Sequence, residues 1–276
     1  MNFPSKPFVW LASYPKSGNT WMRFMLLNLI YGPQETTEKL DALMPDIHKN
    51  RGPIQIQSDR PVLIKTHLLL SPAMPSFNLT AGFIYIVRNP LDVMMSNMNY
   101  AFRMQGIGND PATRNRAREL YIERFINYRG DPNWIPIGIG SWVEHVSSWI
   151  TNAPGFPCLI LKYEDLLADP VVQLDKVSHF LKLHPSAEEL QSAVENSSFE
   201  RMKNIEEKEL TQKIPGFYLA ENTPQGIAEG YRFMFRGKAG AGEKEISPSQ
   251  RERLLAQFGA AIRLAGYSEF QFTDSH

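Results

Sequence analysis

The stretch that decides the fold is FVWLASYPKSGNTW, residues 8–21. Residues 8–12 form a short apolar run that ends in a turn-like Ser-Tyr-Pro, which predicts a buried strand. From Asn19 to Tyr31 apolar residues recur at helical spacing, which predicts a helix. A polar loop between a strand and a helix offers backbone N–H groups and a positive helix N-terminus, which suits a phosphate.

The side chains of this loop are consistent with an anion site. Lys16 adds a point charge, and Ser17, Asn19 and Thr20 add donors. The loop is not a Walker loop, because the G-x-x-x-x-G-K-[ST] pattern is absent. The alternative interpretation is an ordinary turn between a strand and a helix, with an N-cap.

The rest of the chain repeats this alternation of strand and helix. Further strands are predicted over 62–65, 83–87 and 158–162, and further helices over 90–99, 170–183 and 248–264. Without hairpin signals, this order indicates βαβ units and a parallel sheet. We therefore expect one α/β domain over residues 1–276, with a central parallel sheet flanked by helices. Two stretches look irregular, 106–141 and 211–242, and long irregular segments are usually lids or binding loops.

Composition excludes several classes of protein. Lys plus Arg and Asp plus Glu both number 29 in 276 residues, which argues against a nucleic-acid binder with a uniformly basic surface. Cys158 is the one cysteine, so an internal disulfide and a thiolate zinc site are ruled out. The sequence has no run of about 18 apolar residues and no secretory signal pattern. We expect a cytoplasmic protein without a membrane span.

Two further segments place chemistry at predicted strand ends. Arg88 closes the strand at 83–87 and is followed by Pro90, Asp92 and Ser96, so a guanidinium fork and a hydroxyl could hold a phosphate. The alternative is a surface pair between Arg88 and Asp92.

Lys65-Thr66-His67 ends the strand at 62–65, and a histidine there can act as a general base near pH 7. The alternative is a loop histidine with satisfied hydrogen bonds. A late segment, 235–242, sets Arg236 and Lys238 among small residues, which suits a loop that closes over an anion or a solvated linker.

Together these segments resemble the sulfotransferase family that uses 3′-phosphoadenosine 5′-phosphosulfate (PAPS). The Tyr-Pro-Lys-Ser-Gly-x-Thr-Trp signature matches residues 14–21, with Asn at 19, and Arg-x-Pro-x-Asp-x-x-x-Ser matches 88–96. Lys-Thr-His matches 65–67, and the stretches 141–149, 162–166 and 198–203 also resemble the family. The resemblance implies a single α/β domain with the P-loop, nucleotide-kinase-like sulfotransferase fold.

The resemblance also implies the reaction. His67 is the general base that takes the proton of an acceptor hydroxyl while the oxygen attacks sulfur in line. Lys16 neutralises charge on the bridging oxygen of the leaving nucleotide, 3′-phosphoadenosine 5′-phosphate (PAP), and Lys65 assists at the sulfuryl oxygens. No metal is expected, because a sulfuryl group carries less charge than a terminal phosphoryl group.

The resemblance assigns the donor site by parts. The loop binds the 5′-phosphosulfate, Arg88, Ser96, Arg236 and Lys238 hold the 3′-phosphate, Trp21 and Phe199 sandwich adenine, and Tyr163 and Ser197 contact its edge. The full set is Lys16, Ser17, Gly18, Asn19, Thr20, Trp21, Arg88, Ser96, Tyr163, Ser197, Phe199, Arg236, Gly237 and Lys238. For the aromatic members the alternative is core packing. The late loop departs from the family's Arg-Lys-Gly-x-x-Gly-x-Trp, because Gly237 separates the two cations.

The sequence says least about the acceptor and the segments that bind it. We expect residues 97–140 to form an acceptor-binding lid and 211–245 a loop that covers the donor. The aromatic residues of the first segment line a pocket or belong to the core; they are Tyr100, Phe102, Tyr121, Phe125, Tyr128 and Trp134. The resemblance implies a small-molecule hydroxyl acceptor, with glycosylated and phenolic natural products as candidates. The alternatives are a nucleoside or small-molecule kinase and a non-catalytic nucleotide-binding protein; the sequence makes no prediction of oligomeric state.

Overall fold

The computed structural model describes residues 7–49, 62–105, 110–152, 155–228, 230, 232–234, 240 and 242–268. Within these ranges one sheet of four strands has the order β2-β1-β3-β4, and every pair of neighbours is parallel. The strands are β1 (Phe8–Ser13), β2 (Val62–Thr66), β3 (Thr80–Val87) and β4 (Cys158–Lys162). The predicted parallel sheet is confirmed, and β3 begins three residues before the predicted position.

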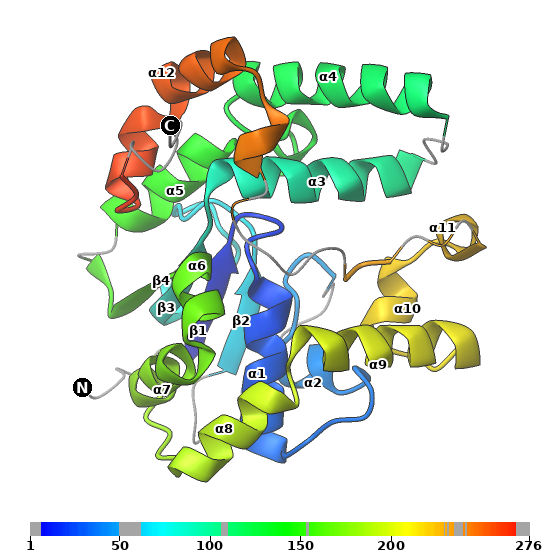
Figure 1. Ribbon diagram of the computed structural model, residues 1–276. Coiled ribbons are helices and arrows are strands. Elements are labelled where there is room, and N and C mark those ends of the chain that lie inside the picture. The colour runs from blue at the N-terminus through cyan, green and yellow to red at the C-terminus, as the bar shows by residue number, and fades with distance from the viewer. Residues whose placement is uncertain are drawn as a thin grey trace.

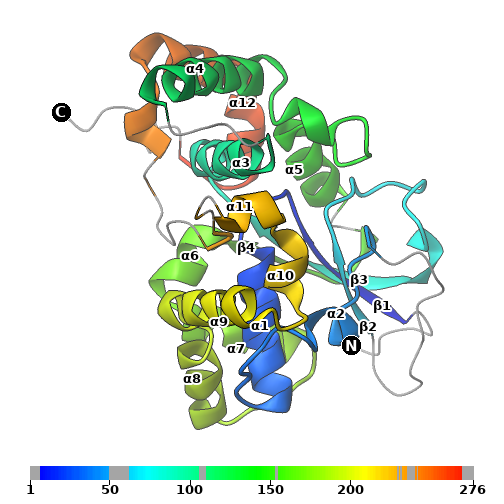
Figure 2. The same ribbon diagram turned by 90° about the vertical axis from the view of Figure 1, so that its right-hand side faces the viewer.

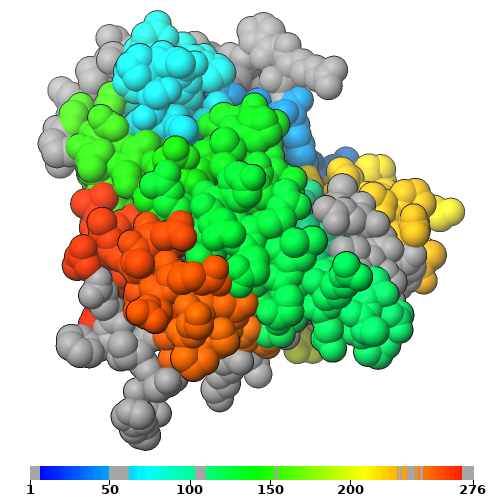
Figure 3. Space-filling model, turned by 90° about the horizontal axis from the view of Figure 1, so that it is seen from above, coloured from blue at the N-terminus to red at the C-terminus, as the bar shows by residue number. Residues whose placement is uncertain are grey.

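The sheet is buried on both faces, and the strand period of two divides its side chains between two cores. In β1, Phe8 and Trp10 enter one core, whereas Val9 and Leu11 enter the other. The first core is completed by α3 (Pro90–Gln105), α4 (Pro111–Asn127), α5 (Trp142–Thr151) and α12 (Pro248–Leu264). Figure 1 shows these helices on one side of the sheet, and in Figure 3 the green α4 and orange α12 cover that end of the molecule.

The second core lies between the opposite face of the sheet and the remaining helices. Its principal helix is α1 (Asn19–Tyr31), which has the predicted bounds and packs on α8 (Ala187–Glu195). The other helices that contribute to it are α2 (Leu40–Leu43), α6 (Tyr163–Ala168), α7 (Pro170–Phe180), α9 (Phe199–Gln212) and α10 (Phe217–Glu221). The chain forms a single α/β domain of three layers.

The prediction of an irregular segment over 106–141 is wrong for its central part, where α4 runs for 17 residues. Asp110 caps the helix by accepting from the Thr113 N–H at 2.8 Å, and Pro111 occupies the first helical turn. Asp-Pro therefore begins a helix here instead of a loop. The helix is polar except for a narrow stripe, so its apolar periodicity is weak. In the second segment, 211–242, the structure describes α10, which packs on α9, and α11 (Pro224–Ala228), which lies beyond α10 in Figure 2.

The parallel sheet brings distant parts of the sequence to one edge. β1 ends at Ser13, β2 at Thr66 and β3 at Val87, and all three carboxyl ends point in the same direction. The loops that follow them carry Lys16, His67 and Arg88 respectively. In open α/β sheets this edge is where ligands bind.

Candidate active site

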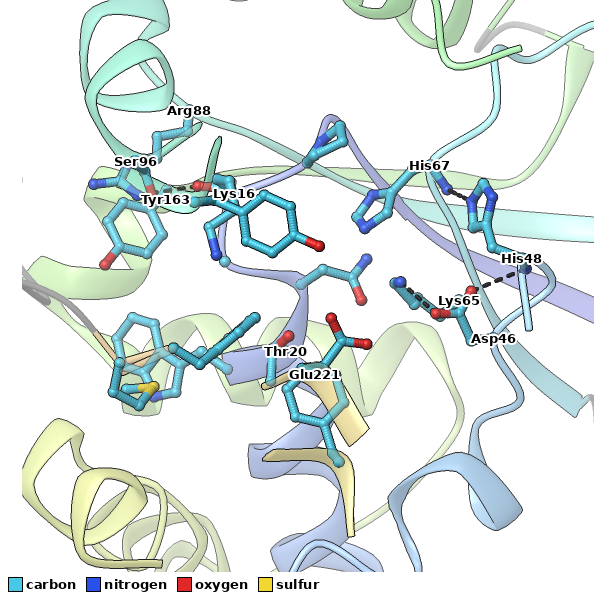
Figure 4. A pocket seen from close by; sticks show the side chains of 18 of the residues that line it. Lys16, Thr20, Asp46, His48, Lys65, His67, Arg88, Ser96, Tyr163 and Glu221 are labelled. Atoms are coloured by element: carbon cyan, nitrogen blue, oxygen red, sulfur yellow. Dashed lines mark hydrogen bonds and ion pairs between the residues drawn. The ribbon is translucent and has the colours of Figure 1, made fainter. Parts of the chain in front are cut away.

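A cavity of about 430 Å³ opens at the carboxyl ends of the strands. Eleven of the predicted site residues line it: Lys16, Gly18, Asn19, Thr20, Trp21, Lys65, His67, Arg88, Ser96, Tyr163 and Phe199. In Figure 4, Lys16 and Arg88 lie on one side, Lys65, His48 and Asp46 lie on the other, and the His67 ring projects inward. The structure thus joins the segments that the sequence singled out.

The loop after β1 is held in a conformation that turns its main chain toward the cavity. Lys16 and Gly18 have φ angles of 70° and 98°. A side chain at Gly18 would meet the Tyr163 ring, because an ideal Cβ would lie 2.6 Å from Tyr163 Cδ2. Asn19 donates from Nδ2 to the Leu11 carbonyl at 3.0 Å, which ties the helix start back to β1. Only glycine fits position 18.

Lys16 crosses the cavity above two rings. Its Nζ lies 4.0 Å from the ring centroid of Phe233 and 5.2 Å from that of Tyr100. Phe233 is fixed by its own main chain, because the buried Glu206 carboxylate accepts from the N–H groups of Phe233 (2.5 Å) and Met234 (2.9 Å). The ammonium is thereby kept inside the cavity, against apolar surfaces that strengthen its field.

Arg88 links the first loop to the wall of the cavity. Its Nη1 donates to the Lys16 carbonyl at 3.0 Å, and its guanidinium lies 4.1 Å from the ring centroid of Tyr163. Burial raises the pKa of Tyr163, which keeps the phenol neutral. Ser96 lines the cavity from the same helix that Arg88 precedes, as Figure 4 shows. Both residues border one cavity, and their role as phosphate donors stays a prediction.

Asp92 has a role that the sequence did not reveal. Its two carboxylate oxygens accept from the N–H groups of Gly240 (2.8 Å) and Gly242 (3.0 Å). The predicted alternative was a surface pair with Arg88, but Asp92 is buried and fixes the late glycine-rich segment against α3. Arg236, Gly237 and Lys238 lie outside the described residues.

The predicted adenine contacts divide into two groups. Trp21, Tyr163 and Phe199 line the cavity, and Trp21 Nε1 donates to the Ser197 carbonyl at 2.8 Å. Ser197 does not reach the cavity, because its buried hydroxyl donates to the Ala193 carbonyl at 2.7 Å. Ser17 likewise is not among the residues that line the cavity, and its buried Oγ has no partner among the described residues.

His67 has a defined tautomer. Its Nδ1 lies 2.6 Å from the Ser13 carbonyl oxygen, which can only accept, so Nδ1 carries the proton. Nε2 of the neutral ring is then an acceptor. Burial, followed by the positive charge of Lys65, holds the pKa of His67 well below its ordinary value. The ring is therefore neutral at pH 7 and able to take a proton.

Lys65 stands beside His67 with a carboxylate partner. Its Nζ lies 2.5 Å from Asp46 Oδ2, and both side chains are largely buried. Burial lowers the pKa of Lys65. Burial alone would raise the pKa of Asp46, but the neighbouring Lys65 outweighs it and lowers that pKa. Asp46 therefore reduces the field that Lys65 presents to the cavity.

Sequence reasoning missed four polar residues of the cavity, Asp46, His48, Lys49 and Glu221. Lys49 Nζ lies 2.6 Å from Glu221 Oε1, which joins α10 to the segment before β2. The main-chain N–H of His67 donates to His48 Nε2 at 2.9 Å. No local motif in the sequence marks these residues, since they lie in segments that reach the cavity only through tertiary packing.

An apolar part of the cavity wall comes from the 97–140 segment. Tyr100, Trp134, Ile137 and Ile139 line it. The loop that carries the last three is connected to the first motif, because the Asp131 N–H donates to Tyr14 Oη at 2.9 Å. Of the other aromatic residues predicted for this segment, Phe102 and Phe125 are buried in the core.

The described residues contain no group of three or more His, Cys, Asp or Glu side chains arranged to hold a metal ion. Nor does any helix within the described ranges combine the length and apolar character that a membrane crossing requires.

Comparison with known proteins identifies the same family as the motifs. The family model described as "Sulfotransferase domain" matches residues 6–266. The chain is 32% identical over 215 residues to Sulfotransferase 1C2 of Oryctolagus cuniculus, covering 74% of this chain and 68% of the relative. It is 30% identical over 265 residues to Sulfotransferase 1C2 of Rattus norvegicus, covering 91% and 82%.

A solved structure shares the fold. The chain superimposes on retinol dehydratase in a complex with retinol and PAP with a TM-score of 0.66, at 19% identity. The match covers 95% of this chain and 83% of the other. The predicted sulfotransferase fold is therefore confirmed at the level of architecture.

Proposed function

The chain belongs to the sulfotransferase family, and we propose that it transfers the sulfuryl group of PAPS to the hydroxyl of a small, largely apolar acceptor, with His67 as general base. The enzyme class follows from the family. The acceptor, the base and the roles of individual residues are the proposal. The observation that carries it is one cavity in which Lys16, Lys65, an apolar wall and a neutral His67 meet, with no hydrogen bond to Nε2 of that histidine from the described residues.

The proton and bond changes can be assigned to named residues. His67 Nε2 takes the hydroxyl proton as the acceptor oxygen forms a bond to sulfur. The bond between sulfur and the 5′-phosphate oxygen breaks, and PAP leaves with both bonding electrons. Lys16 stabilises the negative charge that develops on that oxygen, which is the usual electrostatic contribution to group transfer. Lys65 contributes a smaller share, since Asp46 already balances its charge.

Arg88 and Ser96 are assigned to the 3′-phosphate. A guanidinium fork matches a phosphate in a bidentate way, and the stack on Tyr163 fixes its plane. Trp21 and Phe199 are assigned to the faces of adenine, which their place in the cavity supports. The anchoring of Gly240 and Gly242 by Asp92 supports a donor-covering role for the 211–245 segment.

The acceptor class rests on the part of the cavity wall that comes from the 97–140 segment. Tyr100, Trp134, Ile137 and Ile139 offer rings and branched side chains but no charge, which favours an aromatic or alicyclic alcohol or phenol. Two charged residues that also line the cavity, Lys49 and Glu221, neutralise each other. A strongly charged acceptor would have to break that pair.

The test is transfer of labelled sulfuryl from PAPS to a panel of phenols and alicyclic alcohols by the wild type and His67→Ala. We expect turnover by the wild type and a loss of at least 100-fold in kcat for His67→Ala, in line with general-base catalysis. PAP affinity should change less than two-fold in the variant. Turnover of His67→Ala equal to that of the wild type would contradict the assignment of His67 as general base. Phosphoryl transfer from ATP with magnesium would contradict PAPS as the donor.

A further inference from the structure

The main chain of His67 lies between two other imidazoles. Its N–H donates to His48 Nε2 at 2.9 Å, and its carbonyl lies 3.1 Å from His145 Nε2. Because the carbonyl oxygen can only accept, His145 Nε2 is the donor. Figure 4 shows the dashed bond between His67 and His48 at the edge of the cavity. His67 thus has a hydrogen bond at its N–H, at its carbonyl and at its ring.

His145 is fixed from the core side. It lies fully buried on α5, and its Nδ1 accepts from Tyr85 Oη at 3.0 Å. Burial lowers the pKa of His145 to about 3, so the ring is neutral. With Nδ1 accepting and Nε2 donating, one tautomer satisfies both partners. Two further bonds from α5 hold the next residues: Trp149 Nε1 donates to the Leu68 carbonyl at 3.0 Å, and Ser148 Oγ accepts from the Leu70 N–H at 3.2 Å.

His48 is fixed from the side of the cavity. Its ring accepts at Nε2, so that nitrogen is unprotonated, and burial lowers its pKa against the attraction of Asp46. The His48 main-chain N–H donates to Asp46 Oδ1 at 3.0 Å, while the other oxygen of Asp46 holds Lys65. His48 is therefore tied to the strand residue two positions before His67.

We propose that His48 and His145 are positioning residues that clamp the peptide of His67 from opposite sides and so fix the base relative to sulfur. The proposal rests on His67 being the base. His67 is the first residue after β2 and lies beyond the sheet ladder, so its main chain needs other partners. Group transfer is sensitive to such placement, since a shift of about 1 Å can cost about 100-fold in rate.

His48 also lines the cavity, so a direct contact with the acceptor is the rival explanation. A double-mutant cycle separates the two. If His48 acts through His67, His48→Ala lowers kcat about ten-fold or more in the wild type and less than two-fold in the His67→Ala background. An equal loss in both backgrounds would overturn the proposal in favour of direct contact.

The conservative variants add a second readout. His48→Gln keeps an acceptor near the position of Nε2, and His145→Gln keeps a donor, so each should recover most of the kcat that the alanine variant loses. PAP affinity should be unchanged in the alanine and glutamine variants of both His48 and His145. The matched control is His179→Ala, since His179 is an exposed histidine on α7. If His48→Ala is fully active and His67→Ala is inactive, the positioning role of His48 is refuted and the role of His67 as base stands. If His67→Ala is fully active, the role of His67 as base is refuted.

Discussion

The carbonyl oxygen of Ser13, the last residue of β1, lies 2.6 Å from Nδ1 of His67, the first residue after β2. Two adjacent parallel strands therefore set the tautomer of the proposed base, His67. The bond needs no side chain from Ser13, so it is a property of the sheet edge. It leaves Nε2 as the acceptor. Burial, then the Lys65 charge, lowers the pKa of the ring, although the bond to Ser13 acts to raise it.

The pH dependence of the reaction follows from that depressed pKa. His67 must be neutral to act, and its pKa lies below 6.5, so activity falls only as the pH drops through that lower value. We expect the acid limb of kcat/KM to have a midpoint below pH 6.5, measured with an alcohol that does not titrate in the range. A midpoint above 6.5, or the same limb in His67→Ala, would contradict the assignment.

Gly18 is expected to be irreplaceable in the donor site. An alanine Cβ at a φ of 98° would collide with Tyr163, which also stacks on Arg88. We expect Gly18→Ala to weaken PAP binding at least ten-fold by calorimetry. Gly32→Ala is the matched control: it has a φ of 76° and nothing within 4 Å of its Cβ. It should lower the free energy of unfolding by about 1–3 kcal/mol and leave PAP affinity unchanged. Equal PAP affinities for the two variants would argue against a donor site here.

Asp92→Asn tests the proposed donor-covering role of the 211–245 segment. The variant keeps one oxygen acceptor and loses the charge that strengthens both bonds to Gly240 and Gly242. Losing about 1.5 kcal/mol of charge-assisted bonding should raise the KM for PAPS about ten-fold, with kcat at saturation unchanged. Asp110→Asn, at the exposed cap of α4, is the control and should behave as wild type. A wild-type KM for PAPS in Asp92→Asn would show that the bonds from Gly240 and Gly242 to Asp92 do not contribute to donor binding.

Trp134→Ala tests the apolar wall. Trp134 packs against Tyr100 with ring centroids 6.2 Å apart, and both line the cavity. Removing the indole should raise the acceptor KM about ten-fold or more, because a large apolar contact is lost. The KM for PAPS should stay within two-fold. If only the KM for PAPS rises, this wall contacts the donor and not the acceptor.

The fold could be predicted from the sequence wherever local pattern and burial agree. The central strands are apolar on both faces. α1 and β4 have the predicted bounds because each is a nearly continuous apolar run, and α12 has them because the Ser247 capping box and Pro248 mark its start. α4 was missed, since its exposed residues are charged and Asp110-Pro111 was interpreted as a turn rather than as a cap.

The site was predictable where motifs follow strand ends. Lys16, His67 and Arg88 reach one cavity because parallel strands share an edge. His48 and Glu221 were not predictable, since they depend on how loops pack across that edge. Ser197 differs from these residues: its motif matches the family, but its hydroxyl donates to the Ala193 carbonyl and it does not line the cavity, so its adenine contact stays a prediction.

The most direct test of the central claim is calorimetric titration of the chain with PAP, with ADP and with ATP plus magnesium as controls. Two phosphate sites, one at the loop after β1 and one at Arg88 and Ser96, predict micromolar binding of PAP. ADP lacks the 3′-phosphate and should bind at least ten-fold more weakly. Preference for ATP with magnesium, or no binding of PAP, would contradict the account.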